Sequence, residues 1–168
     1  MNLLSIFTFN NYFWFIFAII NFFMIVGVYK LFGKLGLFAW IAIGAFVANL
    51  QVIKFVDLFF FEAATLGNIM YGTIFLATDV LNEKYGKKEA KKSVFLSFTI
   101  LIFVTIIMRL ALLFTPSDID TMQPHLEAIF EFVPQIVLAS LTAYIISQLL
   151  DVYVFNFIKE KLPTTKYL

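Results

Sequence analysis

Two carboxylates lie inside stretches of the sequence that are otherwise apolar enough to cross a membrane. Asp79 and Asp151 each interrupt a long run of aliphatic and aromatic residues. A charge near the centre of a bilayer costs roughly 2.5–3.5 kcal/mol on insertion scales, so such residues tend to face a cavity lined by protein. There a carboxylate can accept hydrogen bonds from the N–H groups of a ligand. The alternative is a structural ion pair with Lys54 or Arg109.

The stretch around Asp151 carries further polar side chains at helical spacing. Those that share one face of a helix are Ser140, Tyr144, Ser147, Gln148 and Asp151. Such a face would be costly against lipid, so we expect it to pack against other helices as a wall of hydrogen-bond donors and acceptors. The alternative for the hydroxyls is a purely structural hydrogen bond between helices, worth about 0.6 kcal/mol each.

Two other apolar stretches contribute polar residues to the same predicted cavity. One helical face carries Asn68, Gly72, Phe75, Asp79 and Asn82, with Glu83 one turn beyond Asp79. The preceding stretch adds Asn49, Gln51 and Lys54 toward its outer end. Such a lining suits a neutral or cationic heterocycle with several N–H donors. It suits phosphates and carboxylates poorly, because only Lys54 and Arg109 bring positive charge near it.

The elements that position these residues are predicted to be transmembrane helices. Of the 168 residues, 62% are hydrophobic and 14% are charged, whereas soluble domains contain about 45–50% apolar residues. A helix needs about 20 apolar residues to cross the hydrocarbon core. The stretches that we predict to cross are 12–32, 35–56, 63–83, 93–114 and 132–158. The prediction is an all-α, polytopic bundle of five spanning helices, forming a single integral membrane domain over residues 1–168.

Lysines and acidic residues alternate along the connections between these stretches. Lysines concentrate after the first, third and fifth stretches, whereas the other connections hold mainly Asp and Glu. Cytoplasmic loops carry an excess of Lys and Arg. We therefore predict a multi-pass protein of the inner (plasma) membrane, with its N-terminus outside and the end of the fifth span in the cytoplasm. The first stretch is not expected to be a cleavable signal, because the first lysines follow it.

Several kinds of chemistry have no signature in the sequence. There is no cysteine, there is one histidine, and no GxxxxGK[ST], HExxH or GxSxG string occurs. The net charge of +1 argues against a nucleic-acid partner. An aspartic dyad is disfavoured because the two acids are predicted to differ by about 4–5 Å in depth. We therefore expect no enzymatic activity, no metal and no cofactor.

Three strings of the sequence resemble a known family. They are ANLQVIK (48–54), TLGNIMYGTIFLATDVLNEKYGKKEAKK (65–92) and SLTAYIISQLLDVYVFNFIK (140–159). Together they resemble the queuosine precursor transporter family, earlier grouped with vitamin uptake transporters. The resemblance implies import of 7-cyano- or 7-aminomethyl-7-deazaguanine, and a helical core similar to the substrate-binding subunits of energy-coupling-factor importers. The alternative function is such a binding subunit, dependent on a separate ATPase module.

The resemblance also implies a substrate site. The matching positions are Asn49, Gln51, Asp79, Glu83, Gln148 and Asp151, and Tyr144 or Phe75 is expected to stack on the base. The two aspartates are assigned to the N–H edge of the base or to an aminomethyl ammonium, and the two amides Asn49 and Gln148 to its amide edge. Family members normally continue into two further spans, so we expect a sequence truncated before them. The expected partners are the deazaguanine substrate, the bilayer, and an ATPase module or a second copy.

Overall fold

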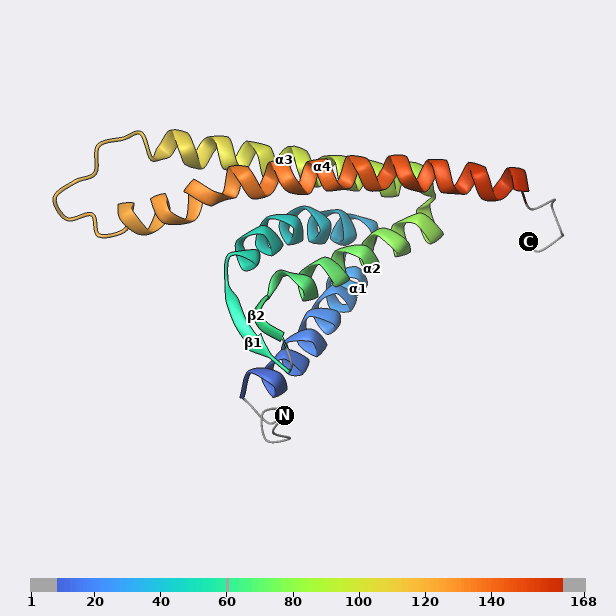
Figure 1. The fold of residues 1–168 in the computed structure, drawn as a ribbon, viewed down its shortest axis with the longest axis horizontal. Helices are drawn as coiled ribbons and strands as arrows, with labels where there is room; N and C mark the ends of the chain where they lie inside the picture. The colour runs from blue at the N-terminus through green and yellow to red at the C-terminus, as the bar shows by residue number, and fades with distance from the viewer. Residues whose placement is uncertain (1–8, 60, 162–168) are drawn as a thin grey trace.

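The described part of the chain forms four helices and a short hairpin (Figure 1). The computed structural model describes residues 9–59 and 61–161, with side chains described for 9–59, 61–143 and 146. In chain order the elements are α1 Phe9–Val52, β1 Phe55–Leu58, β2 Phe61–Thr65, α2 Gly67–Tyr85, α3 Lys87–Ala111 and α4 Gln123–Lys161. Helices α3 and α4 run side by side as one layer, and α1 and α2 pack together beneath it (Figure 1).

Helix α1 consists of two helical segments that meet at a kink. A straight helix of its 44 residues would measure about 66 Å, twice the roughly 30 Å of a hydrocarbon core. Gly33 breaks it, with φ 55° and ψ −133°, and a positive φ of this kind favours glycine. The two segments match the predicted stretches 12–32 and 35–56 up to Val52, so the predicted break lies at the observed kink.

The connection between α1 and α2 is a β-hairpin, which corrects the prediction of an all-α fold. Strands β1 and β2 are antiparallel and pair Phe55 with Thr65. The predicted helices were therefore too long, because residues 55–56 and 63–65 are in strands. Phe, Val and Thr fit a pleated strand well, and hydropathy alone does not separate a short apolar strand from a helix end.

Asparagine and aspartate side chains hold the hairpin in place. Asn11 Oδ1 accepts a hydrogen bond from the backbone N–H of Phe59 at 2.7 Å. Asp57 Oδ1 accepts one from the backbone N–H of Ala63 at 3.0 Å. Both donors belong to residues with positive φ, 52° and 54°, which is uncommon outside glycine. The polar side chains thus stabilise a turn that also contacts the first segment of α1.

Three described helices are long and apolar enough to cross a membrane. They are Phe9–Val52, Lys87–Ala111 and the described part of α4, Gln123–Ala143. Helix α4 begins at Gln123, before the predicted residue 132. Asp120 Oδ1 accepts hydrogen bonds from the N–H groups of Met122 and Gln123 at 2.7 and 3.2 Å, so an N–H at the start of the helix has an acceptor. The chain is therefore a mostly helical, multi-pass membrane protein.

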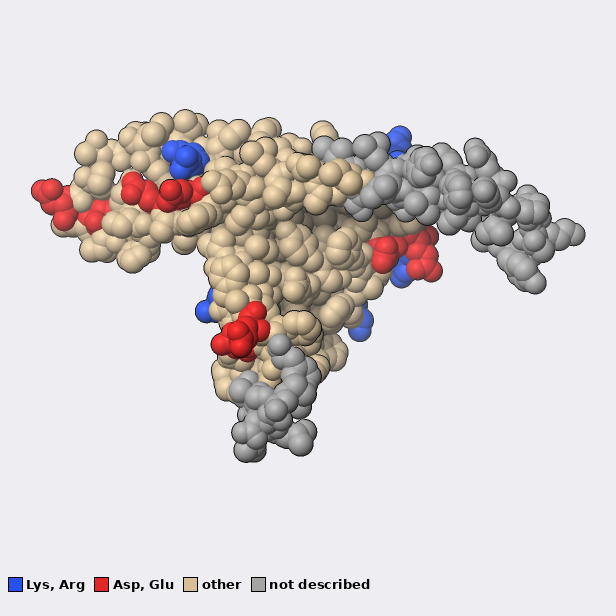
Figure 2. Space-filling view, viewed as in Figure 1, with Lys and Arg blue, Asp and Glu red and all other residues tan. Residues whose placement is uncertain are grey.

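Charged side chains gather at the ends of the helices, and the surface between them is largely uncharged (Figure 2). At one end, Lys34 Nζ lies 2.6 Å from Glu89 Oε2, and Lys84 Nζ donates to the Tyr29 hydroxyl at 3.0 Å. The connections after the first and third predicted spans are thus in contact. The lysine pattern predicts both of them on the same side of the membrane.

A buried hydrogen bond joins the second segment of α1 to α2. Trp40 Nε1 donates to Thr73 Oγ1 at 3.1 Å, and Thr73 in turn donates to the Met70 carbonyl at 2.9 Å. Trp40 is 8% exposed and Thr73 is fully buried. The indole N–H therefore depends on Thr73 for its acceptor.

Replacing Thr73 by valine is expected to lower the free energy of unfolding by about 1–3 kcal/mol, because the Trp40 N–H would stay buried without an acceptor. The measurement is thermal unfolding of the purified protein in detergent. Thr142→Val is the matched control, since Thr142 is exposed and its bond among the described residues is to the Leu138 carbonyl of its own helix. Equal midpoints for the two variants would contradict the prediction.

Candidate functional site

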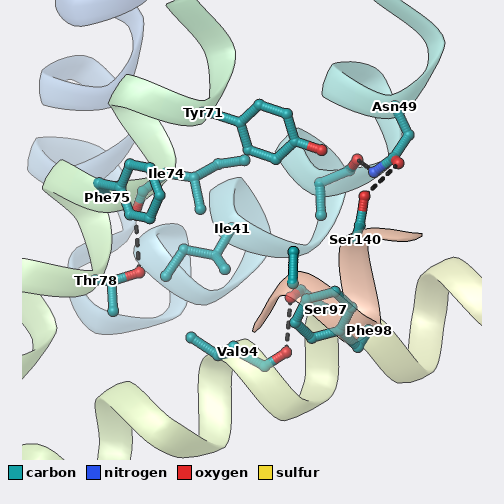
Figure 3. A pocket seen from close by; sticks show the side chains of 12 residues that line it. Ile41, Asn49, Tyr71, Ile74, Phe75, Thr78, Val94, Ser97, Phe98 and Ser140 are labelled. Atoms are coloured by element: carbon teal, nitrogen blue, oxygen red, sulfur yellow. Dashed lines mark hydrogen bonds between the residues drawn. The ribbon is translucent and has the colours of Figure 1, made fainter. Parts of the chain in front are cut away.

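A cavity of about 430 Å³ lies where the second segment of α1 meets α2, α3 and α4 (Figure 3). This volume is within the range of about 300–1,000 Å³ that is usual for small-molecule sites. Its lining residues are Ile41, Ala45 and Asn49 from α1, Tyr71, Ile74, Phe75 and Thr78 from α2, Val94, Ser97 and Phe98 from α3, and Ser140 and Ala143 from α4. Most of these side chains are apolar, and the polar ones are few.

Helical periodicity explains why these residues meet. Ile41, Ala45 and Asn49 follow one another at intervals of four and therefore share one face of α1. The small Ala45 leaves space on that face between two larger side chains. The lining residues of α2 and α3 likewise recur at intervals of three and four. Four helix faces thus converge on one space.

The amide of Asn49 is the best-defined polar group of the cavity. Asn49 is 2% exposed. Its Nδ2 donates to the Ala45 carbonyl at 2.7 Å, and its Oδ1 accepts a hydrogen bond from Ser140 Oγ at 3.3 Å. The second bond joins α1 to α4 across the cavity wall (Figure 3). Within the described residues, one N–H and one lone pair of the amide are left for a ligand.

The other hydroxyls of the lining differ in what they can still donate. Thr78 donates to the Ile74 carbonyl at 2.9 Å, and Ser97 donates to the Val94 carbonyl at 2.7 Å. Their protons are engaged, so they offer only lone pairs to a ligand. The Tyr71 hydroxyl makes no hydrogen bond to any residue in the described part of the chain.

The predicted site residues fall into three groups in the structure. Asn49 lines the cavity. Gln51 lies outside the lining, and its Oε1 is buried with no hydrogen-bond partner among the described residues. Asp79 and Glu83 are exposed on α2 and also lie outside the lining. The third group, Tyr144, Gln148 and Asp151, lies in α4 but outside the described side chains.

The structure therefore brings Asn49 together with Ser140, for which a structural hydrogen bond was the alternative, and with Thr78. Phe75, expected to stack on a base, also lines the cavity and is 67% exposed. No charged side chain belongs to the lining within the described residues. The described cavity is a neutral site with a polar end.

Sequence reasoning missed Tyr71, Ser97 and Phe98. A signal existed for Ser97, because Ser93, Ser97 and Thr105 are small polar residues at intervals of four or eight, and all three are buried. That spacing marks the face of α3 that packs against other helices. Tyr71 and Phe98 carry no comparable signal, since aromatic residues are frequent throughout the chain and many of them are exposed.

Comparison with known proteins agrees with the membrane architecture. The family described as "Putative vitamin uptake transporter" matches residues 65–168, which include all of α2, α3 and α4. The "Probable queuosine precursor transporter" of Bacillus subtilis is 54% identical over 160 residues, covering 95% of this chain and 69% of that protein. A protein of Haemophilus influenzae with the same description is 33% identical over 99 residues, covering 58% of this chain and 40% of the relative.

No solved structure matches the chain significantly. The family match covers more than half of the sequence, and the identity to the Bacillus protein extends over almost all of it. Both descriptions are those of transporters rather than enzymes. The chain therefore belongs to the queuosine precursor transporter family of multi-pass membrane proteins.

Proposed function

We propose that this chain imports 7-deazaguanine precursors of queuosine, in the 7-cyano or 7-aminomethyl form, into the cytoplasm. The observation that carries the proposal is the cavity, whose polar end holds Asn49, Ser140 and Tyr71 between apolar walls. A 7-deazaguanine base has a flat apolar face and an edge with several N–H donors beside one carbonyl oxygen. Lone pairs on Asn49, Ser140 and Ser97 can accept from those donors, and the remaining Asn49 N–H can donate.

The aromatic side chains of the lining suit a planar ligand. Phe75 and Phe98 come from α2 and α3 and both border the cavity (Figure 3). Aromatic rings that contact a base by stacking or edge-to-face contribute about 0.5–1.5 kcal/mol beyond the area they bury. We assign the stacking role to Phe75 and the amide edge of the base to Asn49. The uncharged lining within the described residues favours the neutral cyano form.

The remaining predicted residues are proposed to act around this cavity. Asp79 follows Phe75 by four residues, so it lies on the same side of α2, about 6 Å farther along the axis. We propose that Asp79, with Glu83 one turn beyond it, meets the N–H groups of the base as it leaves the cavity. The spacing of Tyr144, Gln148 and Asp151 from Ser140 supports a role for them in the same wall, and Gln51 is proposed to contribute from the end of α1.

The proposed topology has five crossing segments. They are the two segments of α1, α2, α3 and α4, with the N-terminus outside and the end of α4 in the cytoplasm. The kink at Gly33 and the contact between the lysine-rich turns, through Lys34 and Glu89, support this arrangement. Likeness to the substrate-binding subunits of energy-coupling-factor importers, and association with an ATPase module or a second copy, remain predictions.

Uptake in cells tests the proposal. In a host that can neither make nor import queuosine precursors, expression of the chain is expected to restore queuosine in tRNA when 7-cyano-7-deazaguanine is supplied. The readout is the queuosine content of digested tRNA, with Thr142→Val as a variant expected to behave like the unmodified chain. Absence of queuosine despite chain in the membrane fraction would contradict the proposal.

An experiment with liposomes that contain the purified chain distinguishes a self-sufficient importer from a substrate-binding subunit. Accumulation of labelled 7-cyano-7-deazaguanine without an ATPase present supports a self-sufficient importer. Binding of the base without movement into the lumen supports the alternative, a substrate-binding subunit that requires an ATPase module.

A further inference from the structure

We infer that Tyr71 determines specificity by donating a hydrogen bond to the 6-oxo group of the base, an inference that rests on the proposed function. Tyr71 belongs to α2 and lines the cavity with its side chain partly buried. Its role would be to distinguish 6-oxo bases from analogues that lack a carbonyl at this position.

The first argument comes from the supply of donors in the cavity. The hydroxyl protons of Thr78, Ser97 and Ser140 are directed to protein acceptors. Asn49 directs one of its two N–H groups to the Ala45 carbonyl. The cavity therefore offers many lone pairs and few protons. Among the described lining residues, Tyr71 is the one whose hydroxyl proton has no protein acceptor.

The second argument comes from direction. Figure 3 shows the Tyr71 hydroxyl pointing toward the side of the cavity where Asn49 and Ser140 lie. A donor beside this pair of lone-pair acceptors gives the cavity an edge that alternates donor and acceptor. The 6-oxo group of a deazaguanine lies next to the ring N1–H, and together they form the complementary edge. Tyr71 would donate to the oxygen while Asn49 Oδ1 accepts from N1–H.

The third argument concerns the size of the discrimination. A hydrogen bond between neutral groups adds modestly to affinity, and a buried donor left without an acceptor lowers affinity further. Loss of the Tyr71 donor is therefore expected to reduce the preference of the chain for a 6-oxo base by about tenfold, which corresponds to about 1.4 kcal/mol. A phenylalanine at this position keeps the ring and removes only the proton donor.

The test compares two probes and three proteins. The probes are 7-deazaguanine and 2-amino-7-deazapurine, which has the same ring system but lacks both the 6-oxo group and the N1 proton. The proteins are the unmodified full chain, Tyr71→Phe and Tyr85→Phe, each purified in detergent. Tyr85 is 38% exposed at the end of α2, away from the cavity lining, so its variant controls for loss of a tyrosine hydroxyl. Affinity is measured by calorimetry.

The expected result is a preference for 7-deazaguanine that is roughly tenfold smaller in Tyr71→Phe than in the unmodified chain and in Tyr85→Phe. The preference that persists in Tyr71→Phe is assigned to the N1–H bond with Asn49. If Tyr71→Phe keeps the full preference, the role of Tyr71 is refuted while the proposed substrate class stands. If the unmodified chain binds neither base, the proposed function fails and the inference fails with it. Thermal unfolding midpoints establish that each variant is folded.

Discussion

Substituting Gly36 with alanine is expected to destabilise the protein by about 1–3 kcal/mol, the usual cost of overpacking a close contact. A Cβ atom at this position would lie 2.6 Å from the Val28 carbonyl oxygen and 2.9 Å from Val28 Cγ1. The first of these is a backbone atom, so it cannot move aside by a rotamer change. The kink at Gly33 brings residues 28 and 36 together, and the contact therefore sets how sharply α1 turns.

Gly27 provides the matched control in the same helix. A Cβ added at Gly27 meets no atom within 4 Å, and alanine has the higher helix propensity. Gly27→Ala should therefore leave the unfolding midpoint in detergent unchanged or raise it slightly, whereas Gly36→Ala should lower it. Equal unfolding midpoints for the two variants would show that the kink accommodates the added methyl group without loss of stability. A smaller uptake rate in Gly36→Ala at equal protein level would additionally link the kink to the cavity, because α1 supplies Asn49 beyond it.

The helical part of the fold could be predicted because the relevant signal is local. Runs of apolar residues predict helix where the structure has α1, α2, α3 and α4, and Lys34 and its neighbours mark the break inside α1. The hairpin could not be found in this way. Its residues 55–65 are mostly apolar. Its turn depends on the hydrogen bond that the backbone N–H of Phe59 donates to Asn11 Oδ1, 48 residues earlier in the chain. Such a contact depends on the tertiary fold rather than on local composition.

The candidate site could be predicted where a polar side chain in an apolar stretch would lose its hydrogen bonds to water on burial and therefore needs protein partners. Asn49 stood out because an amide in an apolar stretch requires hydrogen bonds, and the structure supplies them from Ala45 and Ser140. Asp79 stood out for the same reason, yet the cavity lining on α2 stops at Thr78. Helical spacing predicts which face of a helix carries a residue, but it does not predict where along the helix a cavity ends. That point depends on how α3 and α4 pack.

Replacing Asn49 by alanine is expected to reduce the uptake of 7-cyano-7-deazaguanine at least about tenfold, because the variant removes the amide that we assign to the base edge. Loss of the amide also leaves Ser140 without its acceptor on α1. The measurement is the initial rate of uptake in the deficient host, normalised to the amount of chain in the membrane. Asp79→Asn should reduce the rate less, since Asp79 lies outside the lining.

Asn21→Ala is the control that separates a binding role of Asn49 from a structural one. Asn21 is also a buried asparagine of α1, 6% exposed, and its Nδ2 donates to the Phe17 carbonyl of its own helix at 2.8 Å. Like Asn49, it donates to the carbonyl four residues earlier, but it lies in the first segment of α1, outside the cavity lining. If burial and helix bonding were the whole role of Asn49, the two variants would lose uptake equally. A defect confined to Asn49→Ala, at equal thermal stability, assigns the amide to the substrate.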